Sequence, residues 1–146
     1  MRVFLDTNVL ISATVARGLC ADVFRTVIEF HELVVSNHLL EELQRILRTK
    51  FDAPDDLIAE TVWLLHQDTI MAPSKPLASI PLRDVADIAI VSAALNGGAE
   101  ILVTGDKEMV ELKKFGALQI VTPRQFWERQ KGQSRHPGNR RSHGSA

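Results

Sequence analysis

The stretch from Arg83 to Asp106, RDVADIAIVSAALNGGAEILVTGD, places carboxylates at both ends of an apolar segment. Its first half has the periodicity of a helix, because Ile88 and Val91 recur on one apolar stripe. The apolar run Ile101–Val103 is short and precedes a glycine, which is typical of a buried parallel strand. Asp106 follows at the strand end where open α/β sheets bind ligands. The stretch therefore predicts a helix–strand unit with an acid at the ligand-binding edge.

Two acids begin this predicted helix. Asp84 shares the apolar stripe, and Asp87 lies at its edge beside Val91. Acids in a first turn accept hydrogen bonds from unpaired N–H groups and complement the helix dipole. For Asp84 we favour capping, with a supporting role in a site as the alternative. Asp87 lies deeper, and we interpret it as a site residue.

The beginning of the chain repeats this arrangement. Val3–Leu5 is an apolar strand that ends in Asp6, and a helical segment begins soon afterwards. Asn8 follows Asp6 by two residues, and Thr104 precedes Asp106 by two. Their neutral oxygens suit holding a water or orienting an acid, whereas hydrogen bonding within a turn is the alternative.

A further acid comes from the helix predicted after Ser36, which is a good N-cap. With Leu39 at zero on a helical wheel, the apolar stripe centres at about 40°, Glu42 lies at about 300° and Glu41 at about 200°. Glu42 can therefore face the edge of the core, while Glu41 points to solvent. If this helix contributes an acid to a site, it is Glu42; an ordinary solvated boundary residue is the alternative.

The remaining segments complete an alternating pattern. We expect further helices and strands, with a proline-containing connection between them, at Cys20–Glu29, Leu33–Val35, Asp56–Gln67, Thr69–Ala72, Lys107–Lys114, Gln119–Val121 and from Pro123 through Trp127. Alternation of this kind predicts an α/β fold with a parallel sheet and helices on both faces. Right-handed crossovers bring the carboxyl ends of the strands to one edge. Asp6 and Asp106 then meet there, and Asp84, Asp87 and Glu42 can join them.

The 146 residues suffice for one domain with a real core. The single cysteine, Cys20, excludes an internal disulfide framework and fits a reducing compartment. An acid, Asp6, interrupts the first apolar run, and no run approaches the roughly 20 residues of a membrane span. We therefore expect no membrane association and a cytoplasmic location.

Charge is unevenly distributed along the chain. Residues 131–146 contain Lys131, Arg135, Arg140 and Arg141 and no acid; since the whole chain has a net charge of −1, residues 1–130 carry −5. This segment is rich in Gly, Ser and Arg, so we predict a domain over residues 1–130 and a disordered basic tail over 131–146. The tail could attract RNA electrostatically, and a merely solvated tail is the alternative.

Converging carboxylates would repel one another and raise their pKa values, and a divalent cation would remove the conflict. Oxygen ligands favour Mg²⁺ or Mn²⁺ over zinc. The histidines show no zinc spacing, and we interpret them as surface or tail residues: His31, His38, His66, His136 and His143. One or two ions in such a site could activate a water for in-line attack on a phosphodiester.

Several other classes of enzyme are disfavoured. The sequence has no Gly-rich phosphate loop, no GxSxG and no Cys/His pair at a recognisable spacing. A haloacid-dehalogenase-like phosphotransferase needs a second acid two residues after the first, where this chain has Asn8. A phospho-receiver domain needs an aspartate after the third strand, but here Asp68 precedes it.

Five segments in order carry a family resemblance: VFLDTNVLISA, VSNHLLEELQRIL, RDVADIAIVSAAL, ILVTGDKEMVEL and IVTPRQFW. Over roughly residues 1–130 the chain resembles PIN domains, particularly bacterial VapC-like toxins. The resemblance implies a three-layer α/β/α fold with a central parallel sheet of about five strands. It also implies a Mg²⁺- or Mn²⁺-dependent endoribonuclease with an RNA substrate.

The resemblance also assigns residues and partners. The acidic quartet falls on Asp6, Glu42, Asp87 and Asp106, the metal-holding and catalytic residues, with Asn8 and Thr104 in support. Many members are the toxin half of a toxin–antitoxin pair, form dimers and are silenced by an antitoxin that covers the acidic groove. A cognate antitoxin and a homodimer are therefore expected.

One motif departs from the family pattern. Many relatives have Asp-Pro-x-Asp where this chain has Asp84-Val85-Ala86-Asp87, which leaves the role of Asp84 open. The non-enzyme alternative is a degenerate PIN domain that binds RNA or protein without cutting. Because all four quartet positions are acidic, catalysis is favoured.

Overall fold

The computed structural model of the protein describes residues 1–73, 75–77 and 79–134. Strands and helices alternate along the chain in the order β1 (Arg2–Leu5), α1 (Thr7–Val15), α2 (Leu19–Phe30), β2 (Glu32–Val35), α3 (Asn37–Thr49), α4 (Asp55–Leu65), β3 (Ile70–Met71), α5 (Val85–Asn96), β4 (Ile101–Val103), α6 (Lys107–Leu112), β5 (Lys114–Phe115), β6 (Leu118–Val121) and α7 (Pro123–Ser134). The predicted α/β alternation is confirmed.

The strands form one sheet in the order β3-β2-β1-β4-β6-β5. The first five strands in this order are parallel to their neighbours, whereas the last, β5, is antiparallel to β6. The sheet therefore has one strand more than the five or so that were expected. The predicted helix through Lys114 ends at Leu112 instead, because Lys113 has a φ of 64° and turns the chain back into β5.

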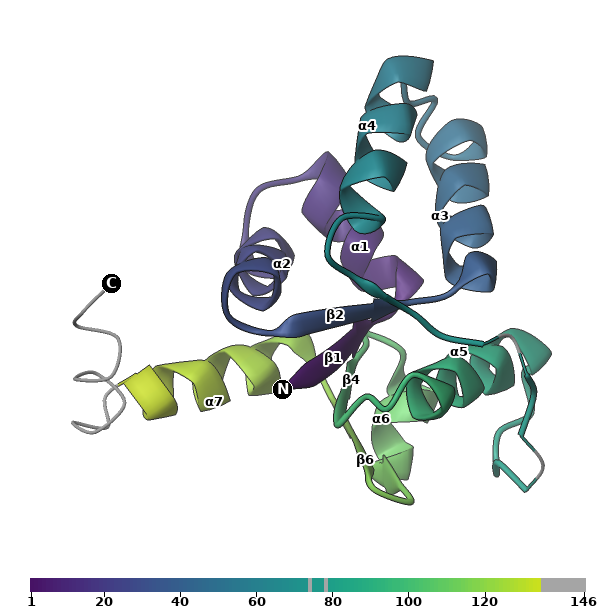
Figure 1. Ribbon diagram of the computed structural model, residues 1–146, viewed down its shortest axis with the longest axis vertical. Coiled ribbons are helices and arrows are strands. Elements are labelled where there is room, and N and C mark those ends of the chain that lie inside the picture. The colour runs from purple at the N-terminus through teal and green to yellow at the C-terminus, as the bar shows by residue number, and fades with distance from the viewer. Residues whose placement is uncertain (74, 78, 135–146) are drawn as a thin grey trace.

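Helices cover both faces of the sheet (Figure 1). In that view α1, α2 and α7 lie on one side of the strands, and α5 and α6 lie on the other. The α3 and α4 helices pack together in the crossover between β2 and β3. This arrangement is the layered α/β/α fold that the sequence predicts, and it leaves the carboxyl ends of the parallel strands at one edge.

Apolar burial on both sides explains why the middle strands have no polar face. Val3–Leu5 and Leu102 are inaccessible to solvent, as expected for a parallel sheet covered by helices. The α5 helix is buried continuously over residues 90–94, where small side chains allow it to approach the sheet. At its end, a Cβ on Gly97 would overlap the side chain of Val34. The end of α5 is thereby held close against β2.

The last helix is longer than predicted. A capping box opens it, because Thr122 Oγ1 accepts from the Gln125 N–H at 3.0 Å and Gln125 Oε1 accepts from the Thr122 N–H at 2.9 Å. The helix continues past Trp127 to Ser134. Residues 131–134, predicted to be disordered, are thus helical, and the rest of the predicted tail lies outside the described residues.

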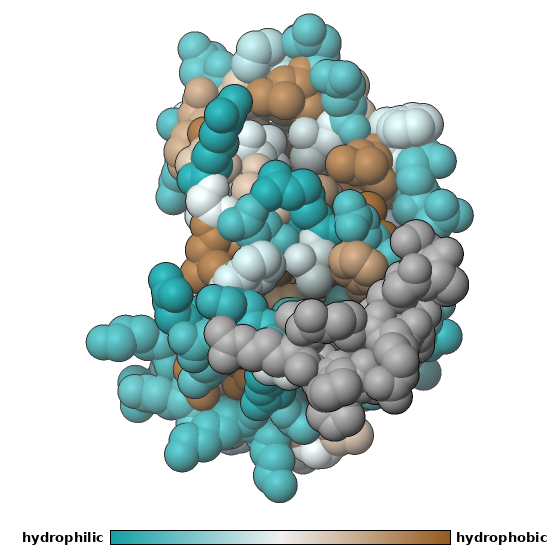
Figure 2. Space-filling model, turned by 90° about the vertical axis from the view of Figure 1, so that its left-hand side faces the viewer, coloured by the Kyte–Doolittle hydropathy of each residue, from teal (hydrophilic) through white to brown (hydrophobic). Residues whose placement is uncertain are grey.

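Apolar side chains are exposed on one side of the molecule. Figure 2 shows them gathered on the upper half of that side, at the level of α1, α2 and α4 in Figure 1. Exposed apolar residues of these helices include Trp63 at 65%, with Val15, Ile28, Phe30 and Leu64. A cavity of about 220 Å³ opens between the three helices. No helix in the described part of the chain combines the length and hydropathy needed to cross a bilayer.

Candidate active site

Asp6 lies at the centre of the candidate site. Leu5 pairs with Val103 in parallel register, so the next residues, Asp6 and Thr104, leave the sheet side by side. Asp6 is only 4% exposed, and three donors hold its carboxylate. Oδ1 accepts from the Thr7 N–H at 2.7 Å, and Oδ2 accepts from Thr104 Oγ1 at 2.6 Å and Asn8 Nδ2 at 3.2 Å. The carboxylate therefore has one fixed orientation.

Asn8 and Thr104, predicted as supporting residues, link the ends of β1 and β4. Thr104 Oγ1 accepts from the Asp106 N–H at 3.0 Å while donating to Asp6. Asn8 Oδ1 accepts from the Gly105 N–H at 3.0 Å while its Nδ2 donates to Asp6. Both side chains therefore contact Asp6 and orient its carboxylate.

Glu42 reaches the same region from α3. Its Oε1 accepts from Thr7 Oγ1 at 2.7 Å, whereas Glu41 is exposed, as the helical wheel predicts. The negative charge of Glu42 contributes to the raised pKa of Asp6. Thr7 was not singled out from the sequence, although it directly follows the strand-end acid and begins α1, the position from which its hydroxyl meets α3.

Asp106 and Asp87 complete the group. Asp106 caps α6, since its Oδ1 accepts from the Met109 N–H at 3.1 Å, and its charge acts on both Asp6 and Asp87. Asp87 lies partly buried in the first turn of α5. Burial, followed by repulsion from Asp106, Asp84, Asp6 and Glu108, raises the pKa of Asp87 from 3.8 to about 6. The four predicted quartet residues therefore share one electrostatic environment.

Asp84 has the capping role that the sequence favours. It is the N-cap of α5, and its Oδ1 accepts from the Ala86 N–H at 2.7 Å. The side chain is exposed rather than on the buried face. Its charge nevertheless helps to raise the pKa of Asp87. Capping accounts for the contacts of Asp84.

The charges that act on Asp6 and Asp87 come from other acids. The salt bridges Arg2–Glu32 and Arg25–Asp22 involve none of the four. Burial raises the pKa of Asp6 despite the opposing hydrogen bonds from Thr104 and Thr7, and the charges of Glu42 and Asp106 raise it further. Such oxygen donors suit a hard divalent cation.

The arrangement of these side chains is open. Within residues 1–73, 75–77 and 79–134, no three His, Cys, Asp or Glu side chains are grouped closely enough to hold a metal ion. The fit to Mg²⁺ or Mn²⁺ therefore rests on the chemistry of the donors and on their mutual repulsion.

Two of the histidines differ from their predicted surface positions. His31 and His38 are partly buried, and each has a buried Nδ1 with no hydrogen-bond partner. His66 is exposed as predicted, and His136 and His143 lie outside the described residues. For His31 and His38, helical spacing alone could not show which loops and helices would cover them.

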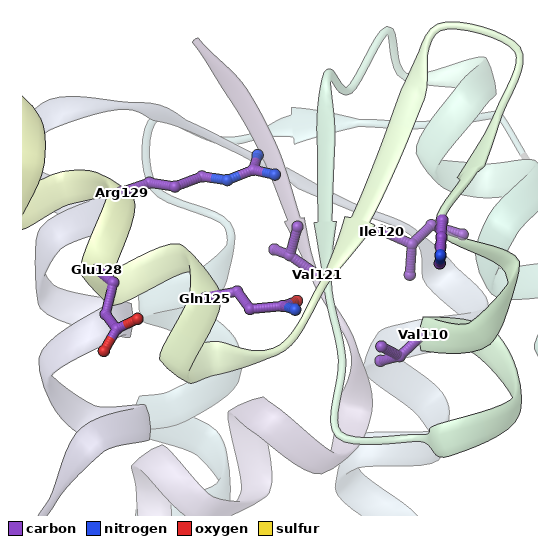
Figure 3. Close-up of a pocket in the computed structure, with 7 residues that line it drawn as sticks. Val110, Ile120, Val121, Gln125, Glu128 and Arg129 are labelled. Atoms are coloured by element: carbon purple, nitrogen blue, oxygen red, sulfur yellow. The ribbon is translucent and has the colours of Figure 1, made fainter.

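An open cleft of about 580 Å³ lies beside the acidic site, between α6 and α7 (Figure 3). It begins at Val110, one helical turn after Asp106, and Ile120 and Val121 form an apolar floor. In Figure 3, Gln125 points across toward β6, whereas Glu128 points away from it. None of the four acids lines this cleft, so it adjoins the candidate site through α6 without containing it.

Comparisons with known proteins agree with this description. The PIN domain model matches residues 2–108. The chain is similar to VapBC2 from Rickettsia felis, crystallised with a DNA fragment from their promoter, with a TM-score of 0.60 and 15% identity over 84% of this chain and 98% of that one. It is also similar to Mycobacterium tuberculosis VapC20, a sarcin-ricin loop cleaving toxin, with a TM-score of 0.57 and 12% identity over 80% of this chain and 98% of that one. The search of curated protein sequences gives no match.

At these identities the solved structures show a shared fold, and the family model supplies the assignment. All four acids fall within residues 2–108, the part that the model matches. The resemblance found in the sequence motifs is therefore confirmed, and the chain belongs to the PIN domain family.

Proposed function

We propose that this chain is a metal-dependent endoribonuclease and the toxin component of a toxin–antitoxin pair. One observation carries the proposal: four acids from four separate elements approach one edge of the sheet, where burial, together with repulsion among them, raises the pKa of both Asp6 and Asp87. Perturbed carboxyl groups concentrated at one site are a signature of function. Asp6, Glu42, Asp87 and Asp106 would hold Mg²⁺ or Mn²⁺.

The role of the protein in this chemistry is placement. A bound divalent ion would activate a water and stabilise charge during in-line displacement at a phosphodiester. Thr104 and Asn8 hold the carboxylate of Asp6, and Thr7 holds that of Glu42. These hydrogen bonds fix the acids before substrate arrives, which reduces the reorganisation that the reaction requires.

Two further observations support a toxin with a protein partner. VapC20 is a toxin that cleaves the sarcin-ricin loop, and VapBC2 was crystallised with DNA from their promoter. The exposed apolar surface over α1, α2 and α4 is the kind that marks interaction sites. We propose that a cognate antitoxin covers the acidic edge. We also propose that the chain forms a homodimer, which sedimentation velocity would check.

Cleavage of a mixed pool of structured and single-stranded RNAs tests the activity. The purified protein is incubated with Mg²⁺, Mn²⁺ or EDTA, beside Asp6→Asn and the matched control Asp68→Asn, which changes an exposed acid outside the site. We expect metal-dependent cutting that Asp6→Asn loses and Asp68→Asn keeps.

Two results would contradict the proposal. Equal cutting by Asp6→Asn, with contaminating nuclease excluded, would remove the acidic site from the reaction. RNA binding without cutting by any variant would instead identify a degenerate PIN domain that acts as a binding module.

A further inference from the structure

A third, smaller cavity lies at the sheet edge that carries the acids. It has a volume of about 190 Å³, opens to solvent, and is lined by residues of α3, α5 and the connection that follows β3. The cavity is lined by the polar side chains of His38, Ser92 and Lys75 and by the apolar side chains of Pro73, Pro76 and Ala89. The volume corresponds to roughly six water molecules in the liquid, which suits one flat heterocycle.

Hydrogen bonds to α5 hold residues 73, 75 and 77 of the connection that lines this cavity. Asn96 Nδ2 donates to the carbonyl oxygens of Pro73 at 3.2 Å and Lys75 at 2.7 Å. The Leu77 N–H donates to Ser92 Oγ at 3.0 Å. The prolines restrict the backbone further, because their rings fix φ. The wall is therefore a built feature of the fold.

Two polar side chains of this cavity have hydrogen-bonding capacity that the other described residues leave unused. His38 Nδ1 is buried without a hydrogen bond. Ser92 is 2% exposed; its oxygen accepts from Leu77, and no acceptor within the described ranges takes its hydroxyl hydrogen. Buried polar groups in native proteins are normally paired with protein, water or ligand. Both groups are buried, and a turn of the His38 ring would be needed to present its Nδ1 to the cavity.

A comparison with His31 shows that His38 is a special case. His31 also has an unpaired Nδ1, but its Nε2 lies 2.9 Å from Gln130 Oε1 and its ring packs edge-on against Phe126. Those contacts give His31 a structural role between α2 and α7. His38 has no such contacts among the described residues, and its ring lines the cavity.

The position of the cavity connects it with the acids. Glu42 lies four residues after His38 on α3, one helical turn along the same face. Asp87 lies two residues before Ala89 on α5, on a different side of that helix. The two helices that form the cavity therefore each contribute one of the four acids, and α3 begins directly after the carboxyl end of β2.

We propose that this cavity is a nucleobase pocket that selects a base beside the cleaved phosphodiester, an inference that rests on the proposed ribonuclease function. Pro73, Pro76 and Ala89 would contact the faces of the base, and His38 and Ser92 its polar edge. The soft χ2 torsion of His38 allows the ring to turn Nδ1 toward the base. Lys75, on the exposed rim, would contact a phosphate of the same strand.

Nucleotide binding tests the pocket independently of cleavage. Each of the four nucleoside 5′-monophosphates is titrated into the ¹⁵N-labelled full chain in EDTA, and the ring nitrogens of His38 are followed by NMR. We expect at least one nucleotide to shift the His38 signals, with binding at least tenfold weaker in His38→Leu and in part retained in His38→Asn, whose amide lies near the position of Nδ1. Exposed His66→Leu is the matched control.

The wild-type titration and the rim variant Lys75→Ala keep the test valid even if His38→Leu does not fold. Lys75 is exposed, so its replacement should weaken nucleotide binding without loss of Tm. Unchanged His38 signals with all four nucleotides at millimolar concentration would overturn the proposal.

Mapping of the cut sites in random-sequence RNA separates this proposal from the ribonuclease proposal. We expect wild type to prefer one base at a position beside the cut, and His38→Leu to reduce that preference at least fivefold. Cleavage with the same preference in both proteins, or with none in wild type, would overturn the pocket and leave the ribonuclease. His38-dependent nucleotide binding without cleavage of any RNA would support the base site and contradict the ribonuclease.

Discussion

The two edges of the central sheet carry charge in opposite ways. At the amino edge, Arg2 Nε lies 3.5 Å from Glu32 Oε1, and the Arg2 guanidinium donates to the Gly97 carbonyl oxygen at 3.1 Å. At the carboxyl edge the neighbours are like charges, and the pKa values of Asp6 and Asp87 are raised. Opposite charges therefore pair in solvent at the amino edge, whereas acids lie near one another at the carboxyl edge.

We interpret the paired charges at the amino edge as structural and the clustered acids at the carboxyl edge as part of the proposed reaction site. An exposed pair such as Arg2–Glu32 adds little to stability and costs little. An acid whose folded-state pKa is raised makes the folded protein less stable once it ionises. Acids of this kind are concentrated at functional sites, which supports the proposal that the carboxyl edge is the reactive one.

The largest expected effect is on cleavage. Asp106→Asn should lower the initial rate of RNA cleavage by more than about a hundredfold, because losing an ion-holding acid should exceed the loss typical of outer-shell contacts. Glu32→Gln, the matched change at the amino edge, should leave the rate within about twofold. Equal losses in the two variants would remove the distinction between the edges.

A smaller effect is expected from the hydroxyl that holds Glu42. Thr7→Val removes the donor to Glu42 Oε1 and should lower the cleavage rate by about tenfold, with a loss of about 1 kcal/mol in the free energy of unfolding. Thr7→Ser keeps the hydroxyl and should recover most of the rate. Failure of Thr7→Ser to recover it would show that the methyl group, and not the hydrogen bond, matters.

The next effect concerns stability against pH, measured in EDTA. The folded-state pKa of Asp87 is about 6, above the ordinary value of 3.8, so the folded chain holds this proton more tightly. Ionisation of Asp87 therefore lowers stability as pH rises from about 4 through 6. Because the side chain is partly exposed, Asp87→Asn should be more stable by about 1 kcal/mol, or about 3 °C in Tm, at pH 7.5.

The difference in Tm between Asp87→Asn and wild type should disappear near pH 4, where the carboxyl group is neutral in the folded state. Thermal unfolding of both proteins across this pH range measures the difference directly. A difference that stays constant over the range would show that ionisation of Asp87 is not its cause.

The smallest effect is expected at the amino edge. Glu32→Gln should lower the free energy of unfolding by less than about 0.5 kcal/mol, because the ion pair is exposed. Added salt should abolish even this difference by screening the pair. Denaturant unfolding at low and high ionic strength would measure it, and a loss above about 2 kcal/mol would show that this edge also depends on its charges.

Local patterns predict the frame of the site. Short apolar strands followed by acids place Asp6 and Asp106 at one edge, because parallel strands end together. Ser36 caps α3 as predicted, with its Oγ accepting from the Leu39 N–H at 3.1 Å. Helical periodicity also distinguishes Glu42 from Glu41, since the two lie on different sides of α3.

Long-range contacts and weak local signals set the limits of prediction. The Thr7–Glu42 hydrogen bond joins residues 35 positions apart, and no local pattern encodes it. The two-residue strand β5 follows from the positive φ of Lys113, a lysine in a conformation usually taken by glycine. The extension of α7 to Ser134 is polar and has no apolar periodicity that would predict it.

The most direct test of the account is a comparison of Tm for wild type and Asp87→Asn in EDTA and in Mn²⁺ at pH 7.5. Without the ion, the variant should unfold at the higher temperature, because one repelling charge is gone. With Mn²⁺, the order should reverse, because wild type gains binding energy that the variant cannot match. If the order is the same in both solutions, the acids at the carboxyl edge do not form a metal site and the central claim is contradicted.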